Sequence, residues 1–332
     1  MKTNNNIPAY RFQGYTDAWE LRKLGELTSY RNGKGYEDNQ SDFGKYELIN
    51  LNSISIEGGL KPSGKFINSA SETLNKNDLV MVLSDVGHGD LLGRVAIIPE
   101  DDRFVLNQRV ALLRNNDYAD CKYLFAYINA NQHYFKLQGA GSSQLNISKK
   151  AVENFVVHIP SQKEQSAIGT FFSTLDQHIT LHQRKLDTLK EQKKTYLKLL
   201  FPAKGQTKPA LRFQGFEDDW EEVKLGEIYK FSQGLQVPVE EQFFEPREEL
   251  VRFIRIVDLT CQNDDIRWVK KNKVGCVSRE DIFFVRYGSV GEIGYGFEGI
   301  IANNLFKLNP LISLHSLFMY QQFKSQKFQN YL

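Results

Sequence analysis

A regular spacing of apolar residues marks the middle of the chain as one long helix. Pro160 precedes Ser161 and Glu164, whose spacing is that of a capping box at a helix start. From there, apolar side chains recur at alternating steps of four and three, the a/d pattern of a coiled-coil seam. The helix should end before Pro202 and Gly205. The seam positions are Ile168, Phe172, Leu175, Ile179, His182, Leu186, Leu189, Lys193, Tyr196 and Leu200.

A single helix of this length cannot bury its apolar seam without a partner. At 1.5 Å per residue, a helix over residues 161–200 would be ~60 Å long. An apolar stripe ordinarily packs against its own globule, but four or more heptads without globular sequence beside them favour a partner helix. We therefore expect a coiled-coil interface along this helix.

The segments before and after the helix repeat one order of elements. Each has two strand-like runs rich in β-branched and aromatic residues, which start at Tyr46 and Asn77 in the first copy. The corresponding runs of the second copy start at Val251 and Glu280. A further apolar run and a helix-like run follow in both copies, so the two segments are expected to share one fold.

The two copies also open with the same motif. The first opener reads "PAYRFQGYTDAWELRKLGEL" from Pro8 and the second reads "PALRFQGFEDDWEEVKLGEI" from Pro209, 201 positions later. A repeat of about 200 residues indicates a duplicated domain, because solenoid repeats are ~20 to 50 residues long. We predict an α+β protein with two repeated mixed α/β domains, residues 1–160 and 205–332, joined by a long coiled-coil-type helix and linker over residues 161–204.

Composition indicates the general class of the protein and its expected location, but it does not indicate a reaction. The 332 residues are 41% hydrophobic and 25% charged, and the longest apolar runs are too short to span a bilayer. The first residues lack the apolar core of a secretory signal, so we expect a cytoplasmic protein without membrane contact. A net charge of +2 gives no global basic field, so any nucleic-acid contact must be local. The three cysteines lack CxxC spacing, which argues against a disulfide framework and a zinc ribbon.

Several strings imitate catalytic motifs, but each fails on one residue or on its context. "GLKPSGKF" from Gly59 has the spacing of a phosphate-binding loop, yet Phe66 stands where a hydroxyl would hold magnesium. "GHGDLLG" from Gly87 is one residue too long for a dinucleotide fingerprint. The histidines show no metal-ligand spacing, and neither a nucleophile elbow nor a [DN]PP[YF] methylation motif is present. We expect neither a catalytic residue nor a metal site.

With duplicated openers, strand-rich domains and a heptad helix between them, the sequence resembles the specificity subunit of type I restriction-modification systems. The resemblance rests on the openers at Arg11 and Arg212, the loop "GAGSSQLNIS" from Gly139, and the segment beginning "FVVHIPSQKEQ" at Phe155. It implies two target-recognition domains that each read one half of a split double-stranded DNA site, and a helix that docks modification (methyltransferase) subunits. It also implies a chain without chemistry or cofactor of its own. S-adenosylmethionine, ATP and magnesium would then belong to the modification subunits and to the restriction/translocase subunit.

Polar, glycine-rich loops contain the residue types that read DNA. Arg or Lys contacts guanine, Asn or Gln contacts adenine, and Lys, Arg and hydroxyl groups bind phosphates. Such loops are more often solvated turns, and the Ser and Asn of "GSSQLNIS" can instead tie the turn to its own backbone. The candidate DNA-binding residues are Arg31, Asn32, Lys34, Lys61, Lys65, Ser142, Ser143, Gln144, Asn146, Lys149, Lys150, Gln233, Gln236, Arg286 and Ser289. The candidates for the subunit interface on the helix are Ile168, Phe172, Leu175, Ile179, His182, Leu186, Leu189, Tyr196 and Leu200.

The second copy departs from the family pattern. Leu124 and Phe125 align with Leu317 and Phe318, so that Leu332 corresponds to about Gly139. Counterparts of the "GSSQLNIS" loop, the closing strand and a second helix do not follow, and we expect a C-terminally truncated second domain. We also expect the unpaired seam to self-associate as an antiparallel dimer. Two alternatives stay open: a DNA-processing enzyme with its own recognition domain, and a truncated or phase-variable fragment that acts as a protein-binding adaptor.

Overall fold

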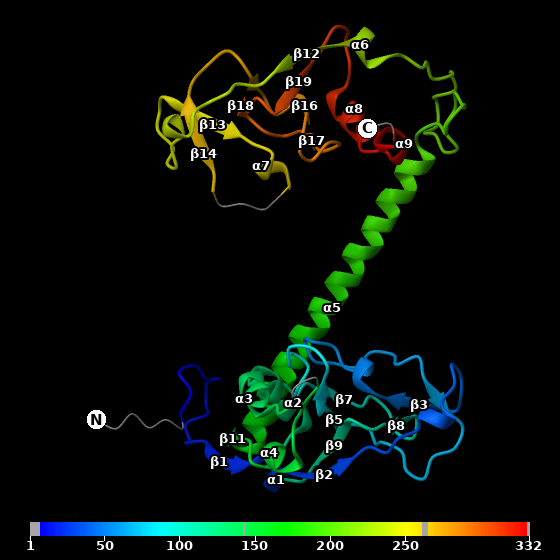
Figure 1. The fold of residues 1–332 in the computed structure, drawn as a ribbon, viewed down its shortest axis with the longest axis vertical. Coiled ribbons are helices and arrows are strands. Elements are labelled where there is room, and N and C mark those ends of the chain that lie inside the picture. Colours follow the sequence, from blue (N-terminus) through cyan, green and yellow to red (C-terminus); the bar gives the residue numbers. More distant parts are fainter. Residues whose placement is uncertain (1–6, 142–143, 261–264, 331–332) are drawn as a thin grey trace. The chain divides into compact units, whose positions relative to one another are not determined.

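The computed structural model describes residues 7–141, 144–260 and 265–330 of the chain (Figure 1). Two compact units share it, Met1–His182 and Gln183–Leu332, called unit 1 and unit 2 below. The long helix α5 (Gln162–Leu199) contributes residues to both units. Its bounds lie within one residue of the helix predicted over residues 161–200. The predicted fold class, two β-rich mixed α/β domains joined by a long helix, is confirmed.

Unit 1 contains two main sheets, two short strand pairs and four short helices in its described residues. The larger sheet has the order β2 (Thr28–Asn32), β9 (Val110–Asn115), β5 (Leu79–Val82), β7 (Val95–Ile97). The smaller sheet has the order β4 (Phe66–Ile67), β3 (Tyr46–Ile49), β8 (Phe104–Leu106). The antiparallel pairs are β1 (Glu20–Lys23) with β11 (Val156–Ile159), and β10 (Leu145–Asn146) with β6 (Ser84–Asp85). The helices are α1 (Leu24–Leu27), α2 (Cys121–Ala130), α3 (Gln132–Gln138) and α4 (Lys149–Glu153).

Unit 2 contains two four-stranded sheets in its described residues. One has the order β12 (Tyr229–Gln233), β19 (Leu305–Pro310), β16 (Ile282–Val285), β17 (Ile293–Gly294). The other has the order β14 (Arg267–Lys270), β13 (Leu250–Ile254), β18 (Gly299–Ile301), β15 (Cys276–Val277). The helices are α6 (Leu225–Ile228), α7 (Val257–Thr260), α8 (Ser316–Phe323) and α9 (Gln326–Gln329). The strand-like run from Val251 therefore divides, because its second part forms α7.

The duplication read from the sequence recurs in the hydrogen-bonding register. Tyr30 pairs with Leu113 between β2 and β9, as Phe231 pairs with Leu308 between β12 and β19. The turns after β2 and β12 match as well. The Gly33 N–H donates to the Val110 carbonyl oxygen of β9, and the Gly234 N–H donates to the Leu305 carbonyl oxygen of β19, each at 3.0 Å. Each unit also contains one parallel pair, β3 with β8 and β13 with β18. The two units are therefore built on one plan.

The central strand β5 of unit 1 is buried on both faces. Leu79 and Met81 contribute to a core that includes helix α2, while Val80 and Val82 pack on the opposite side with Phe104 and its neighbours in the smaller sheet. A strand covered on both faces needs a continuous apolar run, because its side chains alternate between two apolar environments. The run "LVMVL" from Leu79 has this character.

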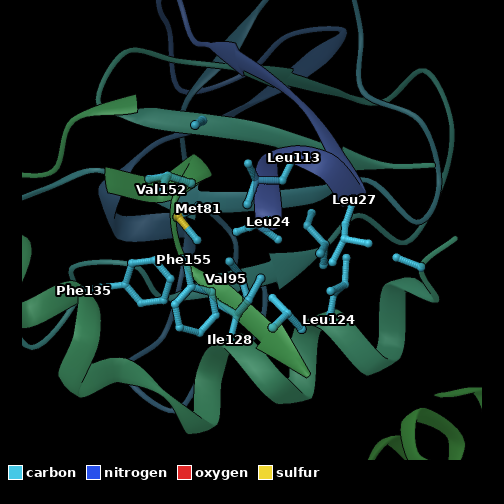
Figure 2. Close-up of a cluster of buried hydrophobic side chains, with 14 of the residues drawn as sticks. Leu24, Leu27, Met81, Val95, Leu113, Leu124, Ile128, Phe135, Val152 and Phe155 are labelled. Atoms are coloured by element: carbon cyan, nitrogen blue, oxygen red, sulfur yellow. The ribbon is translucent and has the colours of Figure 1, made fainter. Parts of the chain in front are cut away.

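Residues from both ends of the first domain meet in the core of unit 1. Figure 2 shows Leu24 beside Met81 of the sheet, with Val152 and Phe155 packed among the same side chains. The rings of Phe155 and Phe135 have centroids 4.7 Å apart. The segment over residues 145–159 therefore completes a core that begins at residue 24.

Side chains of the first opener bind the start of helix α5 within unit 1. Arg11 donates from Nε and Nη2 to the two carboxylate oxygens of Glu164, at 2.7 and 2.6 Å. The Glu164 side chain is 1% exposed. The sequence placed Glu164 in a capping box, but both of its carboxylate oxygens bind a side chain that lies near the start of the chain. Phe12 adds a ring contact with Phe171 of the helix, with centroids 5.6 Å apart.

A second buried residue of the helix start, Gln165, binds the loop before helix α2. Its Nε2 donates to the carbonyl oxygens of Tyr118 and Pro160, each at 3.0 Å, and its Oε1 accepts from the backbone N–H of Asp120 at 2.9 Å. Asp120 in turn caps α2 by accepting from the N–H groups of Lys122 and Tyr123. These bonds satisfy polar groups that would otherwise be buried without partners.

The second opener binds the other end of helix α5, within unit 2. The backbone N–H of Leu211 donates to the carbonyl oxygen of Leu199 at 2.9 Å. Trp220 packs edge-on against Phe201 and Phe318, with centroids 5.9 and 5.7 Å apart. Arg212, the counterpart of Arg11, donates to the backbone oxygen of Asp218 at 2.6 Å. The same motif therefore makes different contacts in the two units.

Replacement of Arg11 by Ala is expected to lower the midpoint of thermal unfolding of unit 1 by several degrees, because it leaves the buried Glu164 carboxylate without its partner. The matched replacement Arg212→Ala should leave the midpoints almost unchanged, since its guanidinium bonds an exposed backbone oxygen. Differential scanning calorimetry of the two variants measures both effects. Equal loss of stability in both variants would contradict this role of the Arg11–Glu164 pair.

Candidate nucleic-acid interface

A polar cavity of about 420 Å³ lies on unit 1 where the two ends of its first domain meet. Its predicted members are Asn32, Asn146 and Lys149, which the sequence selected in separate loops. Three further polar members were not predicted: Ser84, Arg109 and Ser148. The remaining lining residues are Tyr30, Gly33, Leu83 and Ile147. The structure thus brings three separate sequence candidates to one place.

Short strand pairs and one helix start position these side chains. Strand β10 pairs with β6, which sets Asn146 directly opposite Ser84. Ser148 caps helix α4 by accepting from the N–H of Ala151 at 3.2 Å, and Lys149 is the first residue of that helix. Asn32 is the last residue of β2, and its side chain accepts a hydrogen bond from the Tyr30 hydroxyl at 2.6 Å.

Arg109 enters the cavity from the turn between β8 and β9. Its backbone has φ 67°, in the left-handed region that residues other than glycine seldom adopt. The side chain is exposed, and within the described residues its guanidinium makes no hydrogen bond or ion pair. Five N–H donors therefore face solvent beside the other polar groups. The sequence "NQR" at residues 107–109 contains no glycine in the left-handed position, so no turn signal pointed to this residue.

Asn146 has a structural role in the turn. Its Oδ1 accepts from Ser84 Oγ at 2.6 Å and from Gln144 Nε2 at 3.3 Å, and its Nδ2 donates to the Gln144 carbonyl oxygen at 3.1 Å. These bonds agree with the alternative interpretation of the loop, in which Asn ties the turn to its own backbone. Because an amide nitrogen carries two N–H groups, one donor of Asn146 is left for another partner.

A cation and a neutral phenol lie side by side at the edge of the cavity. Burial, with a smaller contribution from the nearby Glu153 carboxylate, raises the pKa of Tyr30 to about 12, so that the hydroxyl remains a donor at neutral pH. Lys149 Nζ lies 5.4 Å from the centroid of the Tyr30 ring and 3.5 Å from Glu153 Oε1. Lys149 is exposed, so its ammonium group can exchange this surface ion pair for an outside anion at little cost.

Other predicted residues of unit 1 lie outside this cavity. Arg31 forms an ion pair with Glu72, and Lys65 forms one with Asp42 at 2.7 Å. Lys34 Nζ donates to Ser71 Oγ at 3.4 Å. Lys61 and Lys150 are exposed, Gln144 is partly buried beside Asn146, and Ser142 and Ser143 fall outside the described residues.

In unit 2 the four predicted residues do not form one polar cluster. Gln233 and Arg286 line a cavity of about 500 Å³ whose other members are mostly apolar. The amide of Gln233 donates to the Asn303 carbonyl oxygen at 2.9 Å. Gln236 accepts from the Asn303 side chain at 3.4 Å, and Ser289 accepts a backbone bond from Glu292 at 3.2 Å.

The predicted seam of helix α5 is largely exposed. Ile168 and Leu200 are the exceptions: Ile168 packs against the core of unit 1, and Leu200 is partly buried. Tyr196 and Leu200 lie at the end of the helix beside a cavity of unit 2 that Trp220 also lines. The seam residues that are exposed are Phe172, Leu175, Ile179, His182, Leu186, Leu189, Lys193 and Tyr196.

The described residues contain neither a candidate metal centre nor a membrane-spanning helix. No group of three or more His, Cys, Asp or Glu side chains is placed to hold a metal ion. Within the same residues, no helix has the length and apolar character needed to cross a membrane.

Comparison with known proteins identifies relatives for most of the chain. A specificity subunit of the type I restriction enzyme MjaVIII from Methanocaldococcus jannaschii is 25% identical over 228 residues, which cover 65% of this chain and 50% of that protein. S.MgeORF438P of Mycoplasma genitalium, named as a type I specificity subunit, is 24% identical over 251 residues, or 74% of this chain and 58% of that protein. The chain therefore spans little more than half the length of these relatives.

A solved structure shares the fold. The crystal structure of the S subunit of a type I restriction-modification system from M. genitalium superimposes with a TM-score of 0.63, at 18% identity. The superposition covers 98% of this chain and 81% of that one. Finally, the sequence model of the family described as "Type I restriction modification DNA specificity domain" matches residues 16–191, more than half of the chain. This chain therefore belongs to the family of type I restriction modification DNA specificity domains.

Proposed function

We propose that unit 1 reads one half of a split DNA sequence through the cavity around Arg109. The observation that carries this proposal is an unpaired guanidinium held among polar side chains in a member of a DNA specificity family. Arg binds the O6 and N7 acceptors of guanine with two parallel hydrogen bonds, the commonest specific contact in the major groove. The left-handed backbone conformation of Arg109 sets the direction in which its side chain leaves the turn, among the polar residues that line the cavity.

The neighbouring residues suit two further parts of the interface. Asn32 and Gln144 can read adenine edges, while Lys149 and Lys150 can bind phosphates on either side. Asn146 supports the loop that presents Gln144 and keeps one N–H donor for a base or phosphate. With a net charge of only +2, these local cations supply the attraction for DNA.

The rest of the chain would complete a type I assembly. In this proposal, unit 2 reads the other half of the DNA sequence, and helix α5 docks the modification (methyltransferase) subunits. The chain itself catalyses nothing: S-adenosylmethionine, ATP and magnesium act on those subunits and on the restriction/translocase subunit. The exposed seam of α5 supports the docking role, because a long apolar stripe in water is stabilised by covering it.

Exchange of residues 1–160 for the first domain of a relative is expected to change one half of the methylated sequence and to leave the other half unchanged. The reason is that the base-reading side chains of unit 1 travel with this segment. Methylation mapping of DNA treated with the reconstituted modification enzyme measures both halves. An unchanged map from an active enzyme would refute the proposal.

Replacement of Arg109 by Ala is expected to weaken binding to the mapped DNA sequence, relative to a random duplex, by ~1 to 3 kcal/mol, the usual value of a two-point contact to a base. Asn146→Ala should reduce this discrimination less and should also loosen the loop, because its amide makes two bonds within the turn and one to Ser84 of β6. Gln183→Ala, an exposed amide on α5, is the control. Fluorescence anisotropy at fixed salt measures all three variants, and full discrimination by folded Arg109→Ala would exclude this residue as a base reader.

We also propose that the isolated chain forms an antiparallel dimer through α5. The side chains of Leu186 and Leu189 are 46% and 52% exposed, and a fully buried large apolar side chain is worth ~1.5 to 3 kcal/mol over an exposed one. A dyad between two copies of unit 1 would turn the DNA target into an interrupted palindrome. His182 and Lys193 would place polar groups in the dimer seam and help to fix its register.

The double variant Leu186→Asp, Leu189→Asp is expected to be monomeric, since two carboxylates at the seam cannot be desolvated together. Thr188→Asp with Thr195→Asp puts the same charges on the outer face of α5 and should leave the dimer intact. Multi-angle light scattering at micromolar concentration measures the mass of each protein. A wild-type chain that is monodisperse and monomeric under these conditions would rule out the dimer.

A further inference from the structure

The duplicated plan of the chain allows the core of one unit to be compared with the core of the other. In unit 1, residues 145–159 form β10, α4 and β11 and cover the core beside α1. Ile147, Val152 and Phe155 of this segment are at most 5% exposed and belong to the same core as Leu24, which is 0% exposed. Figure 2 shows Val152 and Phe155 among the side chains around Leu24. The segment over residues 145–159, called the closing segment below, therefore supplies one wall of the core.

Backbone contacts fasten the closing segment to the first opener. Strand β11 pairs with β1 from Glu20 opposite Ile159 to Lys23 opposite Val156. The N–H of Leu24 donates to the Phe155 carbonyl oxygen at 2.8 Å. Helix α4 approaches α1 so closely that a Cβ on Gly25 would lie 2.9 Å from the Cβ of Glu153. Glycine is needed at this point because real Cβ atoms do not approach so closely.

In unit 2 the matching core residues line the apolar cavity of about 500 Å³. Leu225 corresponds to Leu24 in the repeated opener. The strand registers of the two units make Phe231 the counterpart of Tyr30, and Phe284 the counterpart of Met81. Leu24 is 0% exposed, whereas Leu225 is only partly buried and Phe231 is 48% exposed. The core of unit 2 is thus uncovered at the place where unit 1 carries its closing segment.

Unit 2 nevertheless retains the features that receive a closing segment. Gly226 matches Gly25, yet a Cβ at Gly226 would meet no described atom within 4 Å outside its own helix turn. The residue before each short helix has the same extended backbone, with φ −77° and ψ 145° at Lys23 and φ −77° and ψ 140° at Lys224. Lys224 therefore has the backbone conformation that Lys23 has at the end of β1, where β1 pairs with β11.

We propose that this cavity of unit 2 is a docking site for a polypeptide segment with the pattern of residues 145–159. The occupant has a short helix with an acidic end, then an aromatic residue, then an apolar strand. Its aromatic ring would pack on Phe328, which itself contacts Phe284, as Phe155 packs on Phe135 in unit 1. Its strand would pair with residues 221–224, and its helix would pass over Gly226. This recognition combines strand addition with side-chain pockets, and it does not depend on DNA binding by unit 1.

The test titrates a labelled synthetic peptide of residues 144–161 into the full chain and follows fluorescence anisotropy. Saturable binding with one peptide per chain is expected. Gly226→Ala should weaken it at least about tenfold, because the added methyl group occupies the space of the docked helix. The same variant should unfold at the same temperature as the wild type or higher, since Ala favours a helix over Gly.

Further measurements distinguish binding at this site from nonspecific binding to apolar surface. A scrambled peptide of the same composition should not saturate, and added peptide should slow hydrogen exchange at the Leu225 N–H, the counterpart of the Leu24 donor. Gly25→Ala is the matched variant in unit 1, where it should lower the unfolding temperature because that site is already filled. Equal binding of the scrambled peptide, equal binding by Gly226→Ala, or unchanged exchange at Leu225 with saturating peptide would each overturn the proposal.

Discussion

The fold of unit 1 depends on a closure between its first and last segments. Strand β1 pairs with β11, and Arg11 forms a two-point ion pair with Glu164 at the start of α5. The pair is desolvated on the carboxylate side, so removal of Arg11 would leave a buried charge without a partner, which costs far more than the loss of an exposed ion pair. Through this closure the same residues that complete the core also shape the polar cavity, because β10 and α4 lie within the closing segment. The stability of unit 1 and the shape of the candidate interface therefore depend on the same segment of the chain.

The sequence predicted the elements with strong local signals. The alternation of four and three between Pro160 and Pro202 predicted α5 to within one residue at each end, because heptads and prolines act locally. The repeated openers predicted the duplicated plan for the same reason. Long-range partners could not be read in this way. Glu164 matches a capping box in the sequence but binds Arg11, 153 positions away, and Ile168 fits the seam but packs on unit 1.

The candidate interface was predictable in residue type more than in position. Asn32, Asn146 and Lys149 were selected as polar loop residues, and the structure brings them into one cavity. Arg109 was missed because its role comes from a left-handed backbone at a position without glycine, which no propensity signals. Arg31 and Lys65 are cationic residues like Arg109, but in the structure each forms an ion pair with a carboxylate. Whether a cation is available for DNA is decided by neighbours that are distant in the chain.

The pairing of β1 with β11 also sets the order in which the protein can be made. A ribosome releases the first opener long before Ile159 and Glu164, so Glu20–Lys23 leaves the ribosome without its strand partner. Closing so long a loop is entropically costly and slow, which lengthens the time during which that strand edge is open. Completion of the first domain must therefore wait until the beginning of α5 has been synthesised. The first turn of α5 thus belongs to the same folding unit as the domain that precedes it.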